Sequence, residues 1–431
     1  MLLEVSFGEA IDKYSILEIK KKNITDKYKL IEINKELETL HICKEYIEKQ
    51  QFLYNLLIYI NSEIWDTTNV IKYTNIDYKN YSILSQSIFE LNQKRFRLKN
   101  FFNILFTSNL KEQKSYSSTY CKITINNIET IYDKIPEINF LSIEYDYIMF
   151  EENYLSSIKN FFNQPNIIPL NNDNIFNEII LEDYNIKTEL INTFDLTPIN
   201  YISRGRLGDF IQVLSIINEK FYQTGRKGII YIRNDSSFSK GLQHTYNDTY
   251  DVIKSQRYIY DYKIFNDEKI DIDLEDWFNS NLLYKTSWFN IFKEKYNVDW
   301  GKHKWFNIDY HDSWKDKVLI NIMNYRTPIN IDFHKLYNIF GNSLIFISFD
   351  KFDYDEFVKN TNLNIPNYTP KSFTDCCIAV NSCKLLVASL SGILTIGHAC
   401  HKDRLIGLCG TGDDLHNYEF EKYYNNVYYG V

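Results

Sequence analysis

The chain has 431 residues, of which 44% are hydrophobic and 16% aromatic, and its formal net charge is −8. This length is enough for about three domains, and the apolar content is enough for a globular core. An acidic chain offers no broad basic face to displace counterions from phosphates, so the composition argues against a nucleic-acid partner.

The seven cysteines form no C-x-x-C pair and show no zinc-type spacing with histidine, so we expect free thiols in a reducing compartment. The first residues, MLLEVSFGEAIDKYS, contain no apolar run of signal-peptide length. No apolar stretch of about 18 residues occurs, so no transmembrane segment is expected. These features together predict a cytoplasmic protein.

Residues 1–118 are predicted to form a helical module. Between Ser6 and Glu63 apolar residues recur at helical spacing and alternate with charged faces, as in long amphipathic helices. A break is expected between Asn75 and Tyr81, followed by a helix between Ile83 and Phe106. This helix carries a basic cluster that is either a solvated face or a binding patch: Lys94, Arg95, Arg97 and Lys99.

Four strings in this module, SFGEAIDKYSILEIKKKNI, NSEIWD, FELNQKRFRLKNFFN and LKEQKSY, resemble a bacterial helical family found beside or fused to glycosyltransferases. The resemblance implies no established activity. Its most distinctive residues are Gly8, Glu9, Asp12 and Lys13, which are either a site or an acidic helix start paired with a lysine. The module could serve in acceptor docking or in self-association, including a homodimer through its helices.

Residues 119–195 are predicted to form a small α/β segment or linker domain. Strands are expected at 121–125, 140–150 and 166–170, and helices at 127–135 and 151–162. The polar run 171–174 is typical of a surface loop. No residue pattern in this segment indicates chemistry.

From 196 to 310 the pattern is that of a first α/β half. A strand ending near Ile202 runs into a loop with Gly205 and Gly208, and Asp209 stands at the start of an amphipathic helix. Glycines let backbone approach a ligand, and free N–H groups at a helix start favour anions or sugar oxygens. Asp209 could either accept a proton from a hydroxyl or only cap its helix.

The next strand, GIIYIRND, completes a βαβ unit. Ligands bind at the carboxyl ends of such strands, which would place Arg204, Arg206, Asp209 and residues 234–237 on one edge. The following LQHTYNDTYDVIKSQRYI, with His244, is either a polar stretch suited to sugar hydroxyls or an ordinary surface loop. Most tryptophans of this half are expected in the core.

Residues 311–431 repeat the strand–helix alternation as a second half. The strand KVLINI is followed by a loop with Arg326, and the strand SLIFISFD ends in Asp350. The strand KLLVAS opens into Ser389, Ser391 and Gly392 at the start of the helix ILTIGHACHK. Hydroxyls, a glycine and a helix start together favour a diphosphate.

The two halves, over about 196–425, resemble GT-B glycosyltransferases of the heptosyltransferase-like group. The resemblance implies two Rossmann-like halves, with Asp209 as catalytic base on the acceptor side. It implies that Arg326, Ser389, Ser391 and Gly392 hold the donor diphosphate, and Asp350 or Asp353 would serve the ribose. The family's acid and histidine positions are occupied by Leu390 and Thr395, so the donor sugar is not implied.

The sequence therefore predicts a glycosyltransferase that moves a sugar from a nucleotide-sugar donor to a glycan hydroxyl, with the donor as co-substrate and no further cofactor. An inverting reaction is expected. It is also expected to be metal-independent, because the D-x-D string at 271–273 lies in a charged run typical of a surface. The acceptor or loop residues would be Arg204, Gly205, Arg206, Gly208 and His244. Two other functions stay open: a non-catalytic glycan- or nucleotide-binding scaffold, and a nucleotide-sugar epimerase or isomerase.

Overall fold

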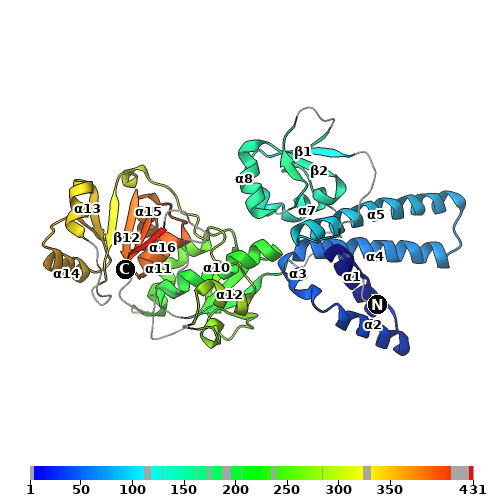
Figure 1. The fold of residues 1–431 in the computed structure, drawn as a ribbon, viewed down its shortest axis with the longest axis horizontal. Helices are drawn as coiled ribbons and strands as arrows, with labels where there is room; N and C mark the ends of the chain where they lie inside the picture. The colour runs from blue at the N-terminus through cyan, green and yellow to red at the C-terminus, as the bar shows by residue number, and fades with distance from the viewer. Residues whose placement is uncertain are drawn as a thin grey trace. The chain divides into compact units, whose positions relative to one another are not determined.

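The computed structural model describes residues 4–110, 118–128, 130–162, 164–171, 176–186, 196–204, 206–233, 238, 240–283, 285–323, 332–408 and 427–430. The chain divides into two compact units (Figure 1). One comprises Met1–Leu196 with Tyr222–Gly225, and the other comprises Thr197–Phe221 with Arg226–Val431.

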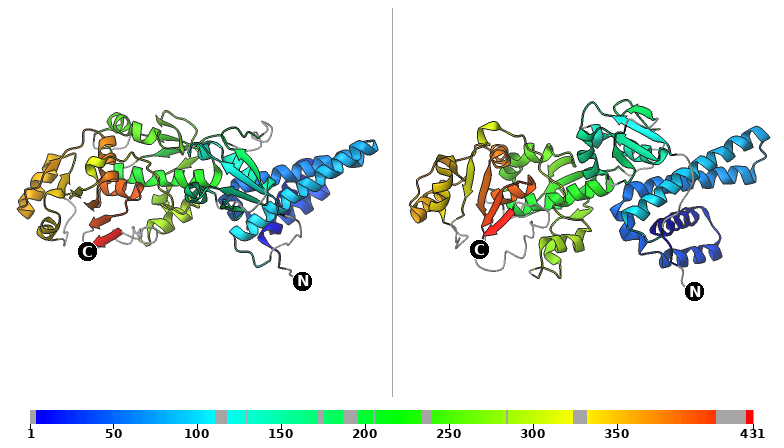
Figure 2. Two further views of the ribbon diagram at one scale, coloured as in Figure 1. Left: turned by 90° about the horizontal axis from the view of Figure 1, so that it is seen from above. Right: turned by 45° about the horizontal axis from the view of Figure 1, so that its top comes forward.

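The helical part of the first unit contains α1 (Phe7–Asn23), α2 (Lys27–Thr39), α3 (Cys43–Lys49), α4 (Gln51–Tyr73) and α5 (Tyr78–Leu105). Side chains of Ser6, Asp26 and Asp77 accept hydrogen bonds from N–H groups of the first turns of α1, α2 and α5, which explains where these helices begin. The two long helices α4 and α5 lie side by side (Figures 1 and 2). The expected helices are confirmed, but the break is earlier and shorter than predicted, because α4 ends at Tyr73 and α5 already begins at Tyr78.

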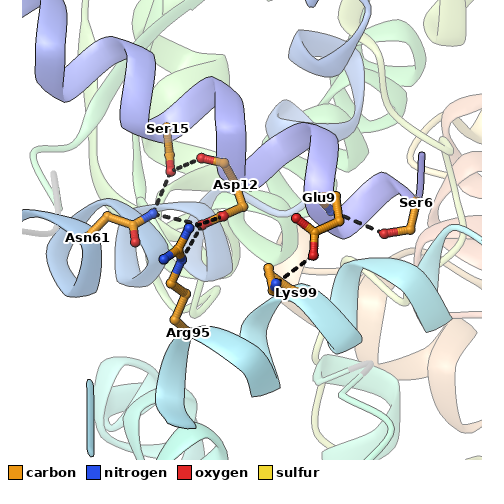
Figure 3. Close-up of polar contacts among 7 residues, drawn as sticks. All are labelled: Ser6, Glu9, Asp12, Ser15, Asn61, Arg95 and Lys99. Carbon is orange, nitrogen blue, oxygen red and sulfur yellow. Dashed lines mark hydrogen bonds and ion pairs between the residues drawn. The ribbon is translucent and has the colours of Figure 1, made fainter. Parts of the chain in front are cut away.

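A buried carboxylate joins three of these helices (Figure 3). Asp12 of α1 is 2% exposed and accepts hydrogen bonds from Asn61 Nδ2 of α4 at 2.9 Å and from Arg95 Nε of α5 at 2.9 Å. Its second oxygen accepts from the Arg95 guanidinium at 2.5 Å. Ser15 Oγ closes the network by accepting from Asn61 at 2.8 Å. Since the carboxylate is paired and hydrogen-bonded, its burial is compensated.

The other distinctive residues of the N-terminal string also make contacts within this module. Glu9 pairs with Lys99 at 2.6 Å, and Lys13 pairs with Glu36 at 2.6 Å. Gly8 lies against α5, where a Cβ on it would stand 2.2 Å from the Lys99 carbonyl oxygen. Gly8, Glu9 and Asp12 thus lie where α1 packs on α5, whereas Lys13 pairs with α2. Self-association through the helices stays a prediction.

The remaining part of the first unit is a small α/β fold. It contains β1 (Tyr120–Thr124), α6 (Thr130–Asp133), α7 (Ile135–Glu144), β2 (Tyr147–Phe150), α8 (Glu152–Phe161), β3 (Ile167–Pro169) and β4 (Asn177–Ile180). All strands are parallel, in the order β3-β2-β1-β4.

One expected strand of this part is wrong in its first half. Residues 140–144 belong to α7, and only 147–150 form a strand. Pro136 stands in the first turn of α7, and Ile135, Ile138 and Leu141 are buried at helical spacing. The alternation of apolar and polar residues suggested a strand at 140–144, but the buried residues of this stretch follow the helical period of α7. The strand β4 has no counterpart in the sequence-based prediction.

The second unit begins with a parallel sheet in the order β7-β6-β5-β8. Its elements are β5 (Ile199–Ser203), α10 (Leu207–Thr224), β6 (Gly228–Ile232), α11 (Leu242–Lys254), β7 (Ile259–Ile264) and β8 (Ile272–Asp273), followed by η1 (Asp276–Asn279) and α12 (Trp288–Tyr296). The polar stretch after β6 is the helix α11 and not a loop, because Thr249, Val252 and Ile253 are buried along one face.

A second parallel sheet follows, in the order β11-β10-β9-β12-β13-β14. Its strands are β9 (Val318–Asn321), β10 (Leu344–Ile347), β11 (Asn367–Tyr368), β12 (Leu385–Ser389), β13 (Leu405–Leu408) and β14 (Val427–Gly430). Its helices are α13 (Phe333–Phe340), α14 (Lys351–Thr361), α15 (Phe373–Ser382) and α16 (Gly392–Ala399). If β9 is counted as the first strand, the order is 3-2-1-4-5-6, which is the strand order of dinucleotide-binding folds.

The predicted fold class, parallel α/β sheets of the Rossmann type preceded by a helical module, is confirmed. Apolar strand residues such as Val318, Phe346 and Val387 form the core of the second sheet. Six cysteines are described, and all are buried free thiols, while Cys409 lies outside the described residues. Among the helices of the described ranges, none is long and apolar enough to cross a membrane.

We predict that Gly8→Ala destabilises the helical module. The methyl group would overlap the Lys99 carbonyl, and overpacking costs roughly 1–3 kcal/mol, more than the gain in helix propensity of about 1 kcal/mol. Hydrogen exchange of α1 peptides in urea should show earlier opening. Gly392→Ala is the control, because its Cβ would meet no atom closer than 3.9 Å and the residue lies outside the helical module, so the exchange of α1 peptides should stay as in wild type. Equal exchange in wild type and Gly8→Ala would contradict the prediction.

Candidate functional site

In the first sheet of the second unit the order in which strands are added reverses at β5, between β5 and the parallel strand β8. The chain runs from β5 to β6 and β7 on one side, then returns to place β8 on the other side of β5. Ligands of open parallel sheets bind outside the carboxyl ends of strands at such a reversal. Ser203 ends β5 there, and Glu275 follows β8.

Glu275 is a buried carboxyl at this reversal. It is 3% exposed, and its Oε1 accepts hydrogen bonds from Ser203 Oγ at 2.8 Å and from the Arg204 N–H at 3.1 Å. Its own N–H donates to Asp273 Oδ1 at 2.9 Å. Its Oε2 is buried and has no hydrogen-bond partner among the described residues. The hydrogen bonds to Oε1 of Glu275 therefore hold the start of the loop that leads to α10.

Burial raises the pKa of Glu275 from its ordinary value of 4.5 to about 7. The hydrogen bonds from Ser203 and Arg204 oppose this shift, whereas the negative charges of Asp209 and Asp273 add to it. A carboxyl with a pKa near neutrality in such a place is a candidate for proton chemistry.

Asp209 lies in the first turn of α10 and is half-buried. It is close enough to raise the pKa of Glu275 through its charge, so the structure brings these two acids together. Arg204 and Arg206 are exposed on the loop between β5 and α10. Gly205 of the same loop lies outside the described residues.

In the second sheet the strand order reverses between the parallel strands β9 and β12, and the serine loop lies at that point. Ser391 caps α16 by accepting from the Leu394 N–H at 3.3 Å, and its hydroxyl donates to Asn321 Oδ1 at 2.8 Å. Ser389 is fully buried, and its Oγ accepts from the Met323 N–H at 2.9 Å. Ser389 thus joins the ends of β9 and β12, whereas Ser391 and Gly392 are half-buried.

Two of the glycines predicted for the site, Gly208 and Gly392, lie next to each other. A Cβ on Gly208 would stand 3.6 Å from Gly392 Cα and 3.5 Å from Thr395 Oγ1. The first turn of α10 therefore lies against the first turn of α16. Thr395 Oγ1 donates to the Ser391 carbonyl at 3.1 Å, which keeps this side chain on its own helix.

The chain segment between the two sheets of the second unit is hydrogen-bonded to both α10 and α16. Trp300 and Trp305 are buried and donate through Nε1 to carbonyls of α10, at Gln212 (2.8 Å) and Ile211 (2.9 Å). The N–H of Phe306 donates to the Ala399 carbonyl at the end of α16, at 2.9 Å. These contacts confirm that the tryptophans of this region are largely core residues.

Other predicted residues lie elsewhere. Asp350 is exposed and caps α14 by accepting from the Phe352 N–H, and Asp353 accepts from Ser348 Oγ at 2.8 Å. His244 is exposed on α11. Arg326 and the loop 234–237 lie outside the described residues.

Sequence reasoning missed Glu275 and Asn321. Asn321 Nδ2 donates to the Ile347 carbonyl at 2.8 Å while its Oδ1 accepts from Ser391, so it bridges β9, β10 and the serine loop. A polar residue at the end of a buried strand is a usable signal for Asn321. Glu275 follows a strand of two residues within a charged run, where no pattern sets it apart.

The first unit has its own hollow, a cavity of about 400 Å³ between α5 and the small sheet. Its lining includes Phe89, Phe96 and Tyr147. The charged groups in its wall pair with one another, Arg97 Nε to Asp146 Oδ1 at 2.8 Å. That pair braces the helix against the sheet.

No protein-family model matches the chain, and a search of curated proteins gives no match either. Among solved structures, the chain is similar to the glycosyl transferase family 9 protein from Veillonella parvula DSM 2008, at 13% identity and a TM-score of 0.27, over 74% of this chain and 89% of that one. It is also similar to E. coli heptosyltransferase WaaC with ADP-2-deoxy-2-fluoro heptose, at 8% identity and a TM-score of 0.25, over 72% and 92%. Both TM-scores are low, so the function of this chain has to be argued from its own residues.

We predict that Glu275 makes folding stability depend on pH. Because its folded-state pKa is raised, its proton is retained in the folded chain after the unfolded chain has lost it. The contribution of Glu275 to the free energy of unfolding should fall by roughly 3 kcal/mol as pH rises from about 4.5 to about 7. The buried His398 and His401, whose pKa values are lowered by burial, act in the opposite direction over this range, so the effect of Glu275 is read as a difference between variants. Chemical denaturation across this range should show that the free energy of unfolding of wild type, taken relative to that of Glu275→Gln, falls by this amount. The difference between wild type and Asp312→Asn, at an exposed carboxylate, should stay constant. A difference between wild type and Glu275→Gln that does not vary with pH would refute the prediction.

Proposed function

We propose that this chain is a glycosyltransferase that moves a sugar from a nucleotide-sugar donor to a hydroxyl of a glycan acceptor. One observation carries the proposal: two Rossmann-type sheets each place a helix start at their reversal point, and the two starts meet at Gly208 and Gly392. One helix start carries the acid Asp209, and the other carries a serine and a glycine. The resemblance of residues 196–425 to heptosyltransferase-like GT-B enzymes assigns the same two roles.

The donor side is the start of α16. Backbone N–H groups and the helix dipole favour the negative diphosphate, and Gly392 allows close approach of the backbone. Ser391 is held by Asn321, so its position is fixed before a ligand arrives. Arg204 and Arg206 are exposed on the loop that leads into α10, where their charges could neutralise a departing diphosphate. Arg326 is a further candidate for this role.

The acceptor side is Asp209. Its carboxylate takes the proton of an acceptor hydroxyl while that oxygen attacks the anomeric carbon of the donor sugar. The bond from the anomeric carbon to the diphosphate breaks, and the nucleoside diphosphate leaves with the electron pair. A single displacement inverts the anomeric centre. With the helix start and arginines to balance the charge, the reaction would need no metal, and the nucleotide sugar would be the only co-substrate.

The two alternatives make different predictions. A scaffold without a donor site should bind no nucleotide, so calorimetric titration with ADP, GDP, UDP, dTDP and CDP separates it from a transferase. An epimerase should change the donor sugar with no acceptor present. The chemical identity of the product with and without an added saccharide distinguishes these cases.

We predict that Asp209→Asn lowers turnover by about 10²- to 10⁴-fold, because the amide cannot accept the proton. Donor binding should be unchanged, since the amide keeps the size of the side chain. Transfer is measured with a panel of nucleotide sugars, and binding by calorimetry with the nucleotide that the wild type prefers. Asp312→Asn is the control for the loss of an acidic side chain. Full turnover in Asp209→Asn would remove Asp209 from the mechanism.

We also predict that Ser391→Ala weakens binding of that nucleoside diphosphate. The change removes a helix cap worth about 1 kcal/mol and the bond to Asn321, so the start of α16 loses its fixed position. Affinity should fall by about tenfold. Ser372→Ala, at the cap of α15, is the matched control and should leave affinity unchanged. Equal affinities in wild type and Ser391→Ala would exclude the serine loop as the diphosphate site.

A further inference from the structure

Glu275 lies near the proposed catalytic base but has no role in the reaction proposed above. It stands at the carboxyl edge of the first sheet, one strand away from the loop that leads to Asp209. Its Oε1 takes two hydrogen bonds from that loop, from Ser203 Oγ and from the Arg204 N–H. Its Oε2 is enclosed without a partner among the described residues. An enclosed carboxyl oxygen with no donor is costly when it is charged.

We infer that Glu275 is a positioning residue for Asp209: its buried carboxyl anchors the loop between β5 and α10, and its charge, once formed, makes Asp209 a stronger proton acceptor. This inference rests on the proposed function. The electrostatic part is reciprocal, because two like charges that interact each favour protonation of the other. Since Asp209 acts on Glu275, an ionised Glu275 acts on Asp209.

The groups that face Glu275 come from four elements. Ser203 and the Arg204 N–H belong to the end of β5, Asp209 to α10 and Asp273 to β8. From α12, Tyr296 is close enough for the charge of Glu275 to raise the pKa of its hydroxyl. That hydroxyl donates to the Asp273 carbonyl at 3.1 Å.

Among these described groups the two acids that act on Glu275 both favour its protonated form, and burial acts in the same direction. Glu275 is therefore neutral below about pH 7 and charged above it. Asp209 gains its negative neighbour only in the upper range. The pair would thus give the base its full strength at neutral and higher pH, where the acceptor proton has to be removed.

The first test is the pH profile of kcat/KM for the wild type and Glu275→Gln, measured with the nucleotide sugar that the wild type turns over. Glutamine keeps the shape and bonding of the side chain without the charge. The rise of the profile should move to lower pH by one unit or more, and the plateau above pH 8 should fall by about threefold to tenfold. KM for the donor should stay constant. An unshifted profile with a uniform loss would mean a merely structural role and would overturn the inference.

Glu219→Gln is the matched control. Glu219 is also a buried glutamate, on α10 itself, but it pairs with His303 and not with Asp209. The change should leave the position of the pH profile unaltered even where it costs stability. A shift as large as that of Glu275→Gln would show that removing any buried glutamate in contact with this half has the same effect, against the inference.

A second measurement needs no substrate. Glutamate labelled with ¹³C at the side-chain carboxyl is followed by NMR against pH in the wild type and in Asp209→Asn, with the Glu275 signal assigned from Glu275→Gln, or from Glu275→Asp if the first variant does not fold. Glu275 should titrate near pH 7 in the wild type and at lower pH in Asp209→Asn. Identical titrations would refute the coupling. A shifted titration in a chain that transfers no sugar would uphold the coupling and reject the proposed function.

Discussion

The second unit depends on two indole hydrogen bonds made inside the protein. Trp300 and Trp305 donate to backbone carbonyls in the second turn of α10, although these carbonyls also take part in the helix. A carbonyl oxygen has a second lone pair, so it can accept both bonds. Both indoles are buried, and an unpaired N–H there would cost about 1–3 kcal/mol. The chain between the two sheets is thereby fixed to the helix that starts with Asp209, and through Phe306 and Ala399 it is fixed to α16 as well.

These hydrogen bonds from one chain segment to α10 and α16 explain why residues far apart in sequence meet. Each helix is rigid, so holding α10 and α16 to one chain segment restricts where their first turns can lie. Those turns meet at glycines, and a side chain is absent at the point where Gly208 and Gly392 approach. The same restriction keeps Asp209 close to Glu275, whose carboxyl holds the preceding loop. The packing of the two helix starts, the position of the loop and the proximity of Asp209 to Glu275 thus all depend on how α10 and α16 are attached to this segment.

The sequence was informative where a local rule determines the structure. Strand–helix alternation predicted the parallel sheets, and the glycine and serine loops were placed at strand ends because such loops follow buried strands. It failed where long-range packing decides. The polar stretch around His244 is helical because its buried face packs on the sheet, and Glu275 gains its properties only from burial next to Asp209. The string around Asp12 left a site and an acidic helix start both open, because its partners Asn61 and Arg95 are 49 and 83 residues away in sequence.

The departure of the serine loop from the heptosyltransferase-like pattern fits this geometry. Those enzymes commonly have a histidine where this chain has Thr395. Here Thr395 Oγ1 lies 3.5 Å from the point where a Cβ of Gly208 would stand, and its hydroxyl turns back to the Ser391 carbonyl. A Cβ at position 208 would be in ordinary van der Waals contact with this hydroxyl, so the two helix starts pack directly against one another here. Thr395 therefore contributes to the contact between α10 and α16, while its own hydroxyl is bonded within α16.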